Sequence, residues 1–186
     1  QARVHELMAL YGASNASTAH LLCDRHEPDR VAYRLVAEDL SSIGLTYGEL
    51  RAESERFAAA MHALGIRSGD RVATLMGKGR DLLVTLMGIW RLGAVHVPLF
   101  TAFAPPAIAF RLNRSMTRLV VTDRTQQGKL APSAGIPESP PWRVITTATD
   151  GDVPQGALSL PGLMAAHRPG FPAAALGGDA PIIEIY

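Results

Sequence analysis

The chain has 186 residues, 47% of them hydrophobic and 19% charged, so it can bury the core of one large domain or of one domain with a cap. Its 18 lysines and arginines nearly balance its 17 aspartates and glutamates, which gives no electrostatic reason to bind nucleic acid or an anionic membrane surface. The single cysteine, Cys23, excludes an internal disulfide and a zinc site built on a cysteine pair.

The start of the chain is predicted to be helical. Apolar residues gather in His5–Leu10 and Ala19–Cys23, with a polar break at residues 12–15, and Pro28 ends the second segment. Because Gln1 is not a natural start, we expect a trimmed N-terminus. No apolar run approaches the ~20 residues that span a bilayer, and no positively charged leader precedes one, so we expect a cytoplasmic protein.

A β-hairpin and a long helix are predicted next. Val31–Val36 alternates as a strand does, and Leu45–Tyr47 would pair with it around a turn at residues 39–44. The segment from Thr46 to Glu49 fits a capping box at the start of a helix. That helix carries one apolar stripe, which predicts a core on one side only, and Gly65 would stop it. The stripe consists of Leu50, Phe57, Met61 and Leu64, and the charged residues off it are Glu53, Glu55 and Arg56.

Residues 69–123 carry the strongest indication of a fold. Three short apolar runs, Arg71–Met76, Ala94–Leu99 and Arg118–Thr122, alternate with two helix-like segments, as in a βαβαβ unit. The sequence therefore predicts an α/β protein, with a largely parallel layered sheet and helices on both of its faces. Sheets of this kind usually carry their chemistry in the loops that follow the strands.

The two helices of this unit are expected to differ. Residues 80–92 are apolar nearly all round, which predicts packing on several sides, and Gly88 within them predicts a close contact. Pro98 stops the following strand or places it at a sheet edge. The second helix starts at Pro105-Pro106, runs to about residue 114, and is expected to turn Ile108, Phe110 and Leu112 inward.

The last third is rich in proline and glycine. We expect a short helix at residues 123–130, a strand at Val144–Thr146, a helix at Leu158–His167, a surface loop at Gly170–Asp179 and a final strand at Pro181–Tyr186. The chain thus divides into a helical lead-in (1–30), an α/β core (31–130) and a Pro/Gly-rich second part (131–186).

Motifs for a self-sufficient catalytic site are missing. The segment Gly77-Lys78-Gly79 lacks the spacing of a phosphate loop and the third glycine of a dinucleotide fingerprint, which disfavours a dinucleotide oxidoreductase and favours a tight turn. The six histidines are scattered without an i, i+4 pair for zinc, and His96 is expected to be a core histidine. Cys23 is expected to be a small buried hydrophobe. Three arginines are expected to be solvated: Arg111, Arg114 and Arg118.

Four segments carry a family resemblance. LTYGEL at residues 45–50, GDRVA at 69–73, RLGAVHVPL at 91–99 and RLVVTD at 118–123 follow one another in this order. Together they resemble the N-terminal part of the adenylate-forming (AMP-binding) superfamily, which includes acyl-CoA synthetases, luciferases and the adenylation domains of peptide synthetases. Within it, the segment GAVHVPLFTAF is most similar to acetyl- and short- to medium-chain acyl-CoA synthetases.

This resemblance implies a two-step ligase. A carboxylate attacks the α-phosphate of ATP to give acyl-AMP and pyrophosphate, the CoA thiol then displaces AMP, and Mg²⁺ offsets the phosphate charge. In the family, a Ser/Thr/Gly-rich loop that holds the ATP phosphates follows the strand that matches residues 181–186. The implied partners are the remainder of the ligase and a small-molecule carboxylate. We expect this piece alone to be inactive, to bind no cofactor tightly, and to self-associate through exposed apolar surface.

The resemblance also implies which residues approach CoA. In acetyl-type members the loop that matches residues 100–103 lies by the CoA entrance, and here Thr101 and Ala102 replace its usual glycines. The segment after the strand at 118–122 often supplies basic side chains to the CoA phosphates, for which Arg124 and Lys129 are the candidates. No catalytic residue and no metal ligand is predicted within the chain.

One other class of protein fits the same pattern. A free-standing, flavodoxin-like α/β module would hold a small ligand or partner without catalysis. The reading frame distinguishes the two hypotheses: continuation past Tyr186 into a Ser/Thr/Gly-Lys loop would indicate the ligase, and a stop codon would indicate the module.

Overall fold

A five-stranded parallel sheet forms the centre of the molecule, as the computed structural model shows for residues 1–133, 135–149 and 151–186. The strand order is β4-β3-β5-β6-β7, with every neighbouring pair parallel. This confirms the predicted α/β fold. The strands are β3 (Arg71–Leu75), β4 (Val95–Pro98), β5 (Leu119–Thr122), β6 (Arg143–Thr146) and β7 (Leu158–Ser159).

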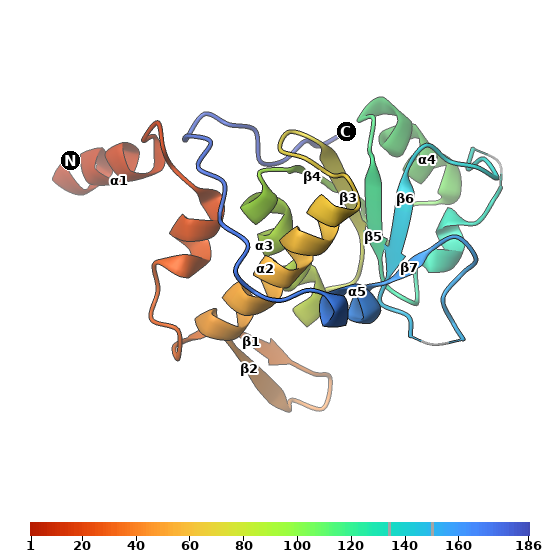
Figure 1. The fold of residues 1–186 in the computed structure, drawn as a ribbon, viewed down its shortest axis with the longest axis horizontal. Coiled ribbons are helices and arrows are strands. Elements are labelled where there is room, and N and C mark those ends of the chain that lie inside the picture. Colours follow the sequence, from red (N-terminus) through yellow and green to blue (C-terminus); the bar gives the residue numbers. More distant parts are fainter. Residues whose placement is uncertain (134, 150) are drawn as a thin grey trace.

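Helices cover both faces of this sheet (Figure 1). On one face lie α2 (Tyr47–Ala63), α3 (Arg80–Leu92) and α5 (Leu160–Ala166), and on the other lies α4 (Pro105–Arg114). Successive strand residues point to opposite faces, so Val121 packs toward α2 and α3 while Val120 packs toward α4. The strands are buried on both sides, which explains their continuous apolar runs.

Among the described residues, α2 and α3 form the most extensive contact between two helices. At the start of α2, Thr46 Oγ1 accepts the N–H of Glu49 at 3.2 Å and the Glu49 carboxylate accepts the N–H of Thr46 at 2.8 Å, which confirms the capping box. A Cβ on Gly88 would lie 2.6 Å from Phe57 Cδ1, so the glycine allows the close approach that its place in α3 predicts. The prediction of a one-sided α2 was wrong, because Glu55 is buried as well.

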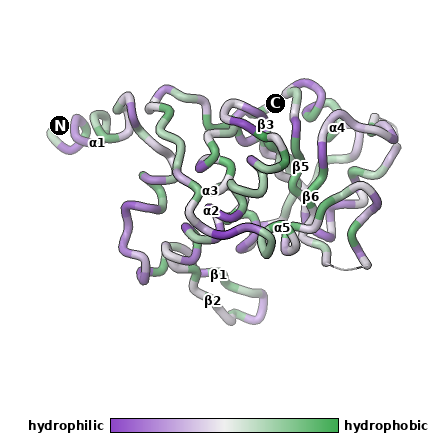
Figure 2. Tube along the Cα trace, viewed as in Figure 1, coloured by the Kyte–Doolittle hydropathy of each residue, from purple (hydrophilic) through white to green (hydrophobic). Residues whose placement is uncertain are grey.

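Four small elements precede α2. Helix α1 (Ala2–Tyr11) buries none of its residues, projects from the body in Figure 1, and carries hydrophobic and hydrophilic residues along its length in Figure 2. The segment η1 (His20–Asp24) is a single π-helical turn. Strands β1 (Val31–Val36) and β2 (Ser42–Thr46) form the predicted antiparallel hairpin, but β2 begins inside the predicted turn.

Three predictions about side chains and helix bounds need correction. Phe110 is 62% exposed rather than inward, because Ile108 and Leu112 lie one turn apart on the buried stripe of α4 and Phe110 lies between them on the far side. Residues 123–130 contain only the 3₁₀ turn η2 (Gln127–Leu130). The predicted helix at 158–167 begins with β7 and becomes α5 at Leu160.

The end of the chain does not form the predicted strand. Residues 181–186 make a single parallel bridge, between Ile183 and His96 at the edge of β4, with hydrogen bonds from His96 N–H to Ile182 O (3.0 Å) and from Glu184 N–H to His96 O (2.9 Å). The apolar run is long enough for a strand, but it pairs with β4 at a single position and not along its length. Among the described residues, no helix is both long and apolar enough to cross a membrane.

Candidate site at the carboxyl edge of the sheet

The strand order indicates that a ligand would bind at the carboxyl ends of the strands. Strands β4 and β5 flank β3, so the connections through α3 and α4 run in opposite directions and over opposite faces. In parallel α/β sheets, ligands bind outside the carboxyl ends of the strands where such connections diverge. That point lies beside the loops that follow β3, β4 and β5.

Asp123 joins two of these loops. Its Oδ2 accepts the N–H of Gly77 at 2.6 Å, and its Oδ1 accepts the Thr125 hydroxyl at 2.6 Å and the N–H of Gln126 at 2.9 Å. Burial alone would raise the pKa of Asp123, but these hydrogen bonds outweigh it and hold the pKa below its usual range. Asp123 therefore stays ionised and fixes the turn at Gly77, a role that the aspartate ending the RLVVTD motif could have suggested.

Three of the four predicted CoA-side residues lie together. The Lys129 ammonium donates to the carbonyl oxygen of Thr101, which joins η2 to the loop after β4, and Ala102 follows in that loop with its side chain exposed. This contact sets the position of the loop relative to the segment after β5.

Arg124, the fourth, makes different contacts. Its side chain is exposed and pairs with Asp152 at 2.7 Å, while its N–H donates to Thr147 Oγ1 at 3.1 Å. It is thus bound to the segment after β6 and not to Thr101 or Lys129. Since an exposed ion pair contributes only about 0–1 kcal/mol, this guanidinium is free to exchange Asp152 for another anion.

The remaining titratable candidates are not reactive groups. Buried His96 hydrogen-bonds Thr74 Oγ1 through Nε2 at 2.8 Å, and burial lowers its pKa to about 4, so it is neutral near pH 7. Burial, followed by the neighbouring Asp24 charge, raises the pKa of Cys23 to about 12, so it remains a thiol. Both predictions for these side chains are confirmed.

The prediction for Arg111 was wrong. Its guanidinium lies 4.0 Å from the centre of the Phe103 ring and donates to the carbonyl oxygens of Ala107 (2.9 Å) and Tyr186 (3.0 Å). It therefore connects α4 with the loop after β4 and with the end of the chain. Arg118, by contrast, forms the exposed ion pair expected of a surface residue, with Asp70 at 2.8 Å.

Within residues 1–133, 135–149 and 151–186, no group of three or more His, Cys, Asp and Glu side chains could hold a metal ion.

The fold defines a parallel α/β protein, and its candidate site lies in the loops at the carboxyl ends of the strands. A family model described as "AMP-binding enzyme" matches residues 21–168, which is most of the chain. The chain therefore belongs to the AMP-binding family.

Relatives in the family are acyl-CoA ligases. Acetyl-coenzyme A synthetase of Streptomyces avermitilis is 34% identical over 110 residues, covering 57% of this chain and 17% of that protein. The long-chain-fatty-acid–CoA ligase FadD13 of Mycobacterium tuberculosis is 31% identical over 153 residues, covering 80% of this chain and 28% of that protein. The matched part of this chain thus spans 17% of the length of the first relative and 28% of the length of the second.

Solved structures agree. An acyl-CoA synthetase of Brucella canis superposes with a TM-score of 0.85 at 32% identity, covering 98% of this chain and 34% of that one. A benzoate CoA ligase of Burkholderia xenovorans superposes with a TM-score of 0.70 at 25% identity, covering 87% and 31%. The resemblance found in the sequence is confirmed, and the alternative of a flavodoxin-like module is not favoured.

Proposed function

We propose that this chain is the N-terminal part of an AMP-forming acyl-CoA synthetase, most similar to the acetyl- and short- to medium-chain enzymes. The complete ligase would activate a small carboxylic acid with ATP to acyl-AMP and transfer the acyl group to CoA, in the cytoplasm. The observation that carries this proposal is the family match over residues 21–168, together with the 98% coverage of this chain by an acyl-CoA synthetase structure.

The side chains of this chain indicate which part of the ligase binds ATP and which part only lines the site. His96 and Cys23 are buried and hold pKa values unsuited to proton transfer or nucleophilic attack near pH 7. We therefore assign ATP and Mg²⁺ to the parts of the ligase outside these 186 residues, and to this chain a wall of the site.

The CoA side of that wall is the loop pair joined by Lys129. Phosphates are bound by cationic side chains and by backbone N–H groups, and this edge presents the cations of Arg124 and Lys129 on neighbouring elements. Thr101 and Ala102 would line the entrance as the counterparts of glycines. Their side chains would keep CoA slightly further from the backbone of the loop.

A split between two half-reactions tests the CoA assignment in the full-length ligase. Arg124→Ala should raise the KM for CoA roughly 10- to 150-fold, because a charge-assisted hydrogen bond contributes about 1.5–3 kcal/mol. It should leave ATP–pyrophosphate exchange, which precedes CoA binding, unchanged. Lys129→Met should act in the same direction and also loosen the loop at Thr101.

The matched control is Arg118→Ala. Arg118 is also an exposed arginine in an ion pair. It precedes β5, however, and therefore lies at the amino ends of the strands, opposite the candidate site. It should leave both half-reactions unchanged. An Arg124 variant that weakens both half-reactions equally, or neither, would remove the CoA assignment.

The isolated chain provides a separate test of the division of labour. We expect it to release no pyrophosphate above background when it is given ATP, Mg²⁺ and carboxylates from acetate to octanoate. Turnover by the 186-residue chain would mean that it holds a complete adenylation site.

A further inference from the structure

The end of the chain crosses α2 and α3 as an extended segment, here called the strap (residues 168–186; the blue trace in Figure 1). Three hydrogen bonds fix it to the helices. Gly170 N–H donates to Glu55 Oε2 at 2.8 Å, Ala174 N–H donates to the backbone oxygen of Arg91 at 2.8 Å, and Trp90 Nε1 donates to the backbone oxygen of Ile182 at 3.0 Å.

The strap is also bound to the lead-in. Gly177 N–H donates to the backbone oxygen of Ala16 at 3.0 Å, and Gly178 N–H donates to that of Ala13 at 3.1 Å. The two outermost segments of the chain therefore lie side by side on the same helices. Whatever releases one of them removes contacts of the other.

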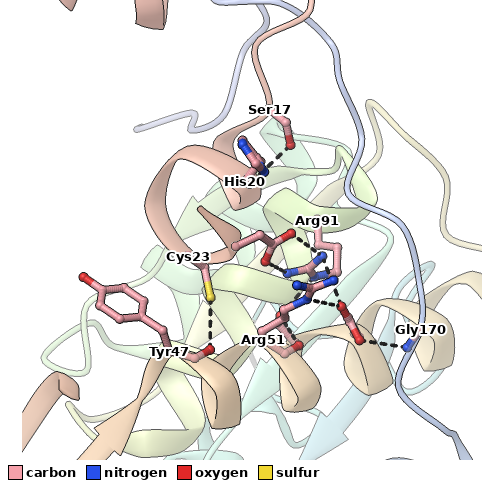
Figure 3. Close-up of polar contacts among 10 residues, drawn as sticks. Ser17, His20, Cys23, Tyr47, Arg51, Arg91 and Gly170 are labelled. Carbon is pink, nitrogen blue, oxygen red and sulfur yellow. Dashed lines mark hydrogen bonds and ion pairs between the residues drawn. The ribbon is translucent and has the colours of Figure 1, made fainter. Parts of the chain in front are cut away.

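A set of charges centred on the buried Arg91 lies beneath both segments (Figure 3). Arg91 of α3, with its side chain 1% exposed, donates through both terminal nitrogens to Asp24 of η1, at 3.0 and 2.5 Å, and through Nε to Ser54 Oγ at 3.0 Å. Its Nη1 lies 3.8 Å from Glu55 Oε1, which also accepts Arg51 Nε at 2.9 Å. We call these side chains the Arg91 cluster: Asp24, Arg51, Ser54, Glu55 and Arg91.

The cluster is electrically balanced only when it is complete. Two arginines face two carboxylates whose side chains are about nine-tenths buried, and one of the carboxylates, Glu55, holds the strap directly. Removing one partner of a buried ion pair leaves an uncompensated charge, which costs more than the pair contributes. Without Arg91, Asp24 loses this cation and Glu55 keeps only the half-exposed Arg51, so both carboxylates gain solvation when η1 and the strap move away from α2 and α3.

Exposed polar contacts, including the hydrogen bond from Arg111 Nε to the backbone oxygen of Tyr186 at 3.0 Å, hold the last residues of the strap. The side chains of Ile182, Ile183 and Ile185 are between 40 and 72% exposed, so they bury little apolar surface. The ion pair between Glu184 and Arg71 is partly exposed and 3.4 Å long. The hydrogen bonds to His96 at the edge of β4 are therefore supported mainly by contacts that solvent can replace.

We propose that the Arg91 cluster is a latch: its closure holds the lead-in and the strap against α2 and α3, and its opening releases both together and uncovers the edge of β4. The latch is a conformational device of this chain and does not depend on the proposed ligase activity. It makes residues 181–186 a segment that can be docked or released while the sheet stays folded.

Native-state hydrogen exchange on the 186-residue chain tests this device. Arg91→Met should accelerate exchange of the strap amides Gly170, Ala174 and Glu184, and of the β4 edge amide of His96, by roughly 10- to 100-fold. Lead-in amides such as Leu21 should accelerate by a similar factor. Amides of the central strand β5 should accelerate far less, because the sheet stays folded.

Arg80→Met is the matched control. Arg80 also pairs with a glutamate of α2, Glu53 at 2.6 Å, but its side chain is a third exposed and it does not contact the strap. It should leave the strap amides unchanged. If Arg91→Met does not fold, Glu55→Gln keeps the size of the side chain, removes its charge, and should accelerate the strap amides by roughly three- to tenfold.

Two results would overturn the proposal. One is uniform acceleration at β5 and the strap, which would make the cluster an ordinary stabilising contact. The other is release of the strap without the lead-in, which would show that the two segments open separately.

Discussion

Gly88 shows how one missing side chain positions two helices. A Cβ there would lie 2.6 Å from Phe57 Cδ1 and 3.2 Å from the backbone oxygen of Ser54. The sequence predicted a close contact because a mid-helix glycine costs up to ~1 kcal/mol against alanine. It could not name the partner, which lies on α2, some thirty residues earlier in the chain.

Gly88→Ala should therefore lower the free energy of unfolding by about 1–3 kcal/mol, since overpacking at a buried contact outweighs the gain in helix propensity. Urea unfolding followed by circular dichroism measures the change. Gly162→Ala in α5 is the control: its nearest neighbour, Ser159 Cβ, is 3.5 Å away, so this variant should gain about 0.5–1 kcal/mol. Equal effects at the two positions would contradict the close packing of α2 on α3.

His96 predicts a pH dependence of stability. Its pKa is about 4 in the folded chain against 6.5 for an unperturbed histidine, so between these values the unfolded chain binds a proton that the folded chain does not. The free energy of unfolding should fall as the pH drops from 6.5 towards 4, by at most about 1.4 kcal/mol per pH unit from this side chain. Above pH 6.5 this contribution is complete and constant.

NMR titration of the histidine rings measures this directly. The His96 resonances should not move above pH 5, and His96→Leu should flatten the stability profile between pH 6.5 and 4.5, although it leaves the Thr74 hydroxyl without its partner. A His96 ring that titrates near pH 6.5 would show that it reaches solvent.

For single residues, the sequence predicted burial correctly where it depends on neighbours along the chain. The burial of Cys23 and His96 followed from apolar neighbours in the sequence. The sequence did not predict the buried Glu55 or the engaged Arg111, because their partners, Gly170 and Tyr186, lie more than seventy residues away along the chain. A charged residue is usually solvated, and only the fold reveals the exceptions.

Helix α2 illustrates how a local motif defines an element. Its capping box satisfies free N–H groups at the first turn, and its end at Leu64 is followed by Gly65 with φ +87°. These signals lie within the helix ends, so both ends were predictable from sequence.

Thr46→Ala should lower the free energy of unfolding by about 1 kcal/mol, because the N–H of Glu49 loses its acceptor. Thr46→Ser keeps the hydroxyl and should change the stability by a few tenths of a kcal/mol at most. Thermal unfolding of the pair provides the comparison. If the two variants were equally destabilised, the methyl group rather than the hydroxyl would be the important part of Thr46.

The last element shows the limit of pattern recognition. Residues 181–186 have the apolar content of a strand, yet they form one bridge at His96. A strand needs a partner along its length, and the sequence of a segment does not state whether that partner is present.

Across the whole molecule, large hydrophobic side chains are exposed in several places, including Val36 and Ile43 of the β1–β2 hairpin. Helix α1 has no buried residue and exposes Val4 and Met8, and the strap exposes Ile185. Surface of this kind promotes association. The isolated chain should therefore form concentration-dependent oligomers in light scattering and bind a hydrophobic dye. A monodisperse monomer that binds no dye would contradict this expectation.

The four motifs were sufficient for the family, and three of them cover β3, β4 and β5, the first three strands of the sheet along the chain. The candidate CoA side was predicted from the same resemblance, and the structure adds the contact between Lys129 and the Thr101 loop. The Arg91 cluster was not predicted, since it joins four segments that only tertiary packing brings together.

We propose that this chain forms part of an AMP-forming acyl-CoA synthetase. The most direct measurement is product analysis of the full-length ligase incubated with ATP, Mg²⁺, CoA and carboxylates from acetate to octanoate. We expect AMP, pyrophosphate and an acyl-CoA thioester in equal amounts. Formation of ADP and phosphate, or the absence of a thioester with every carboxylate, would contradict the claim.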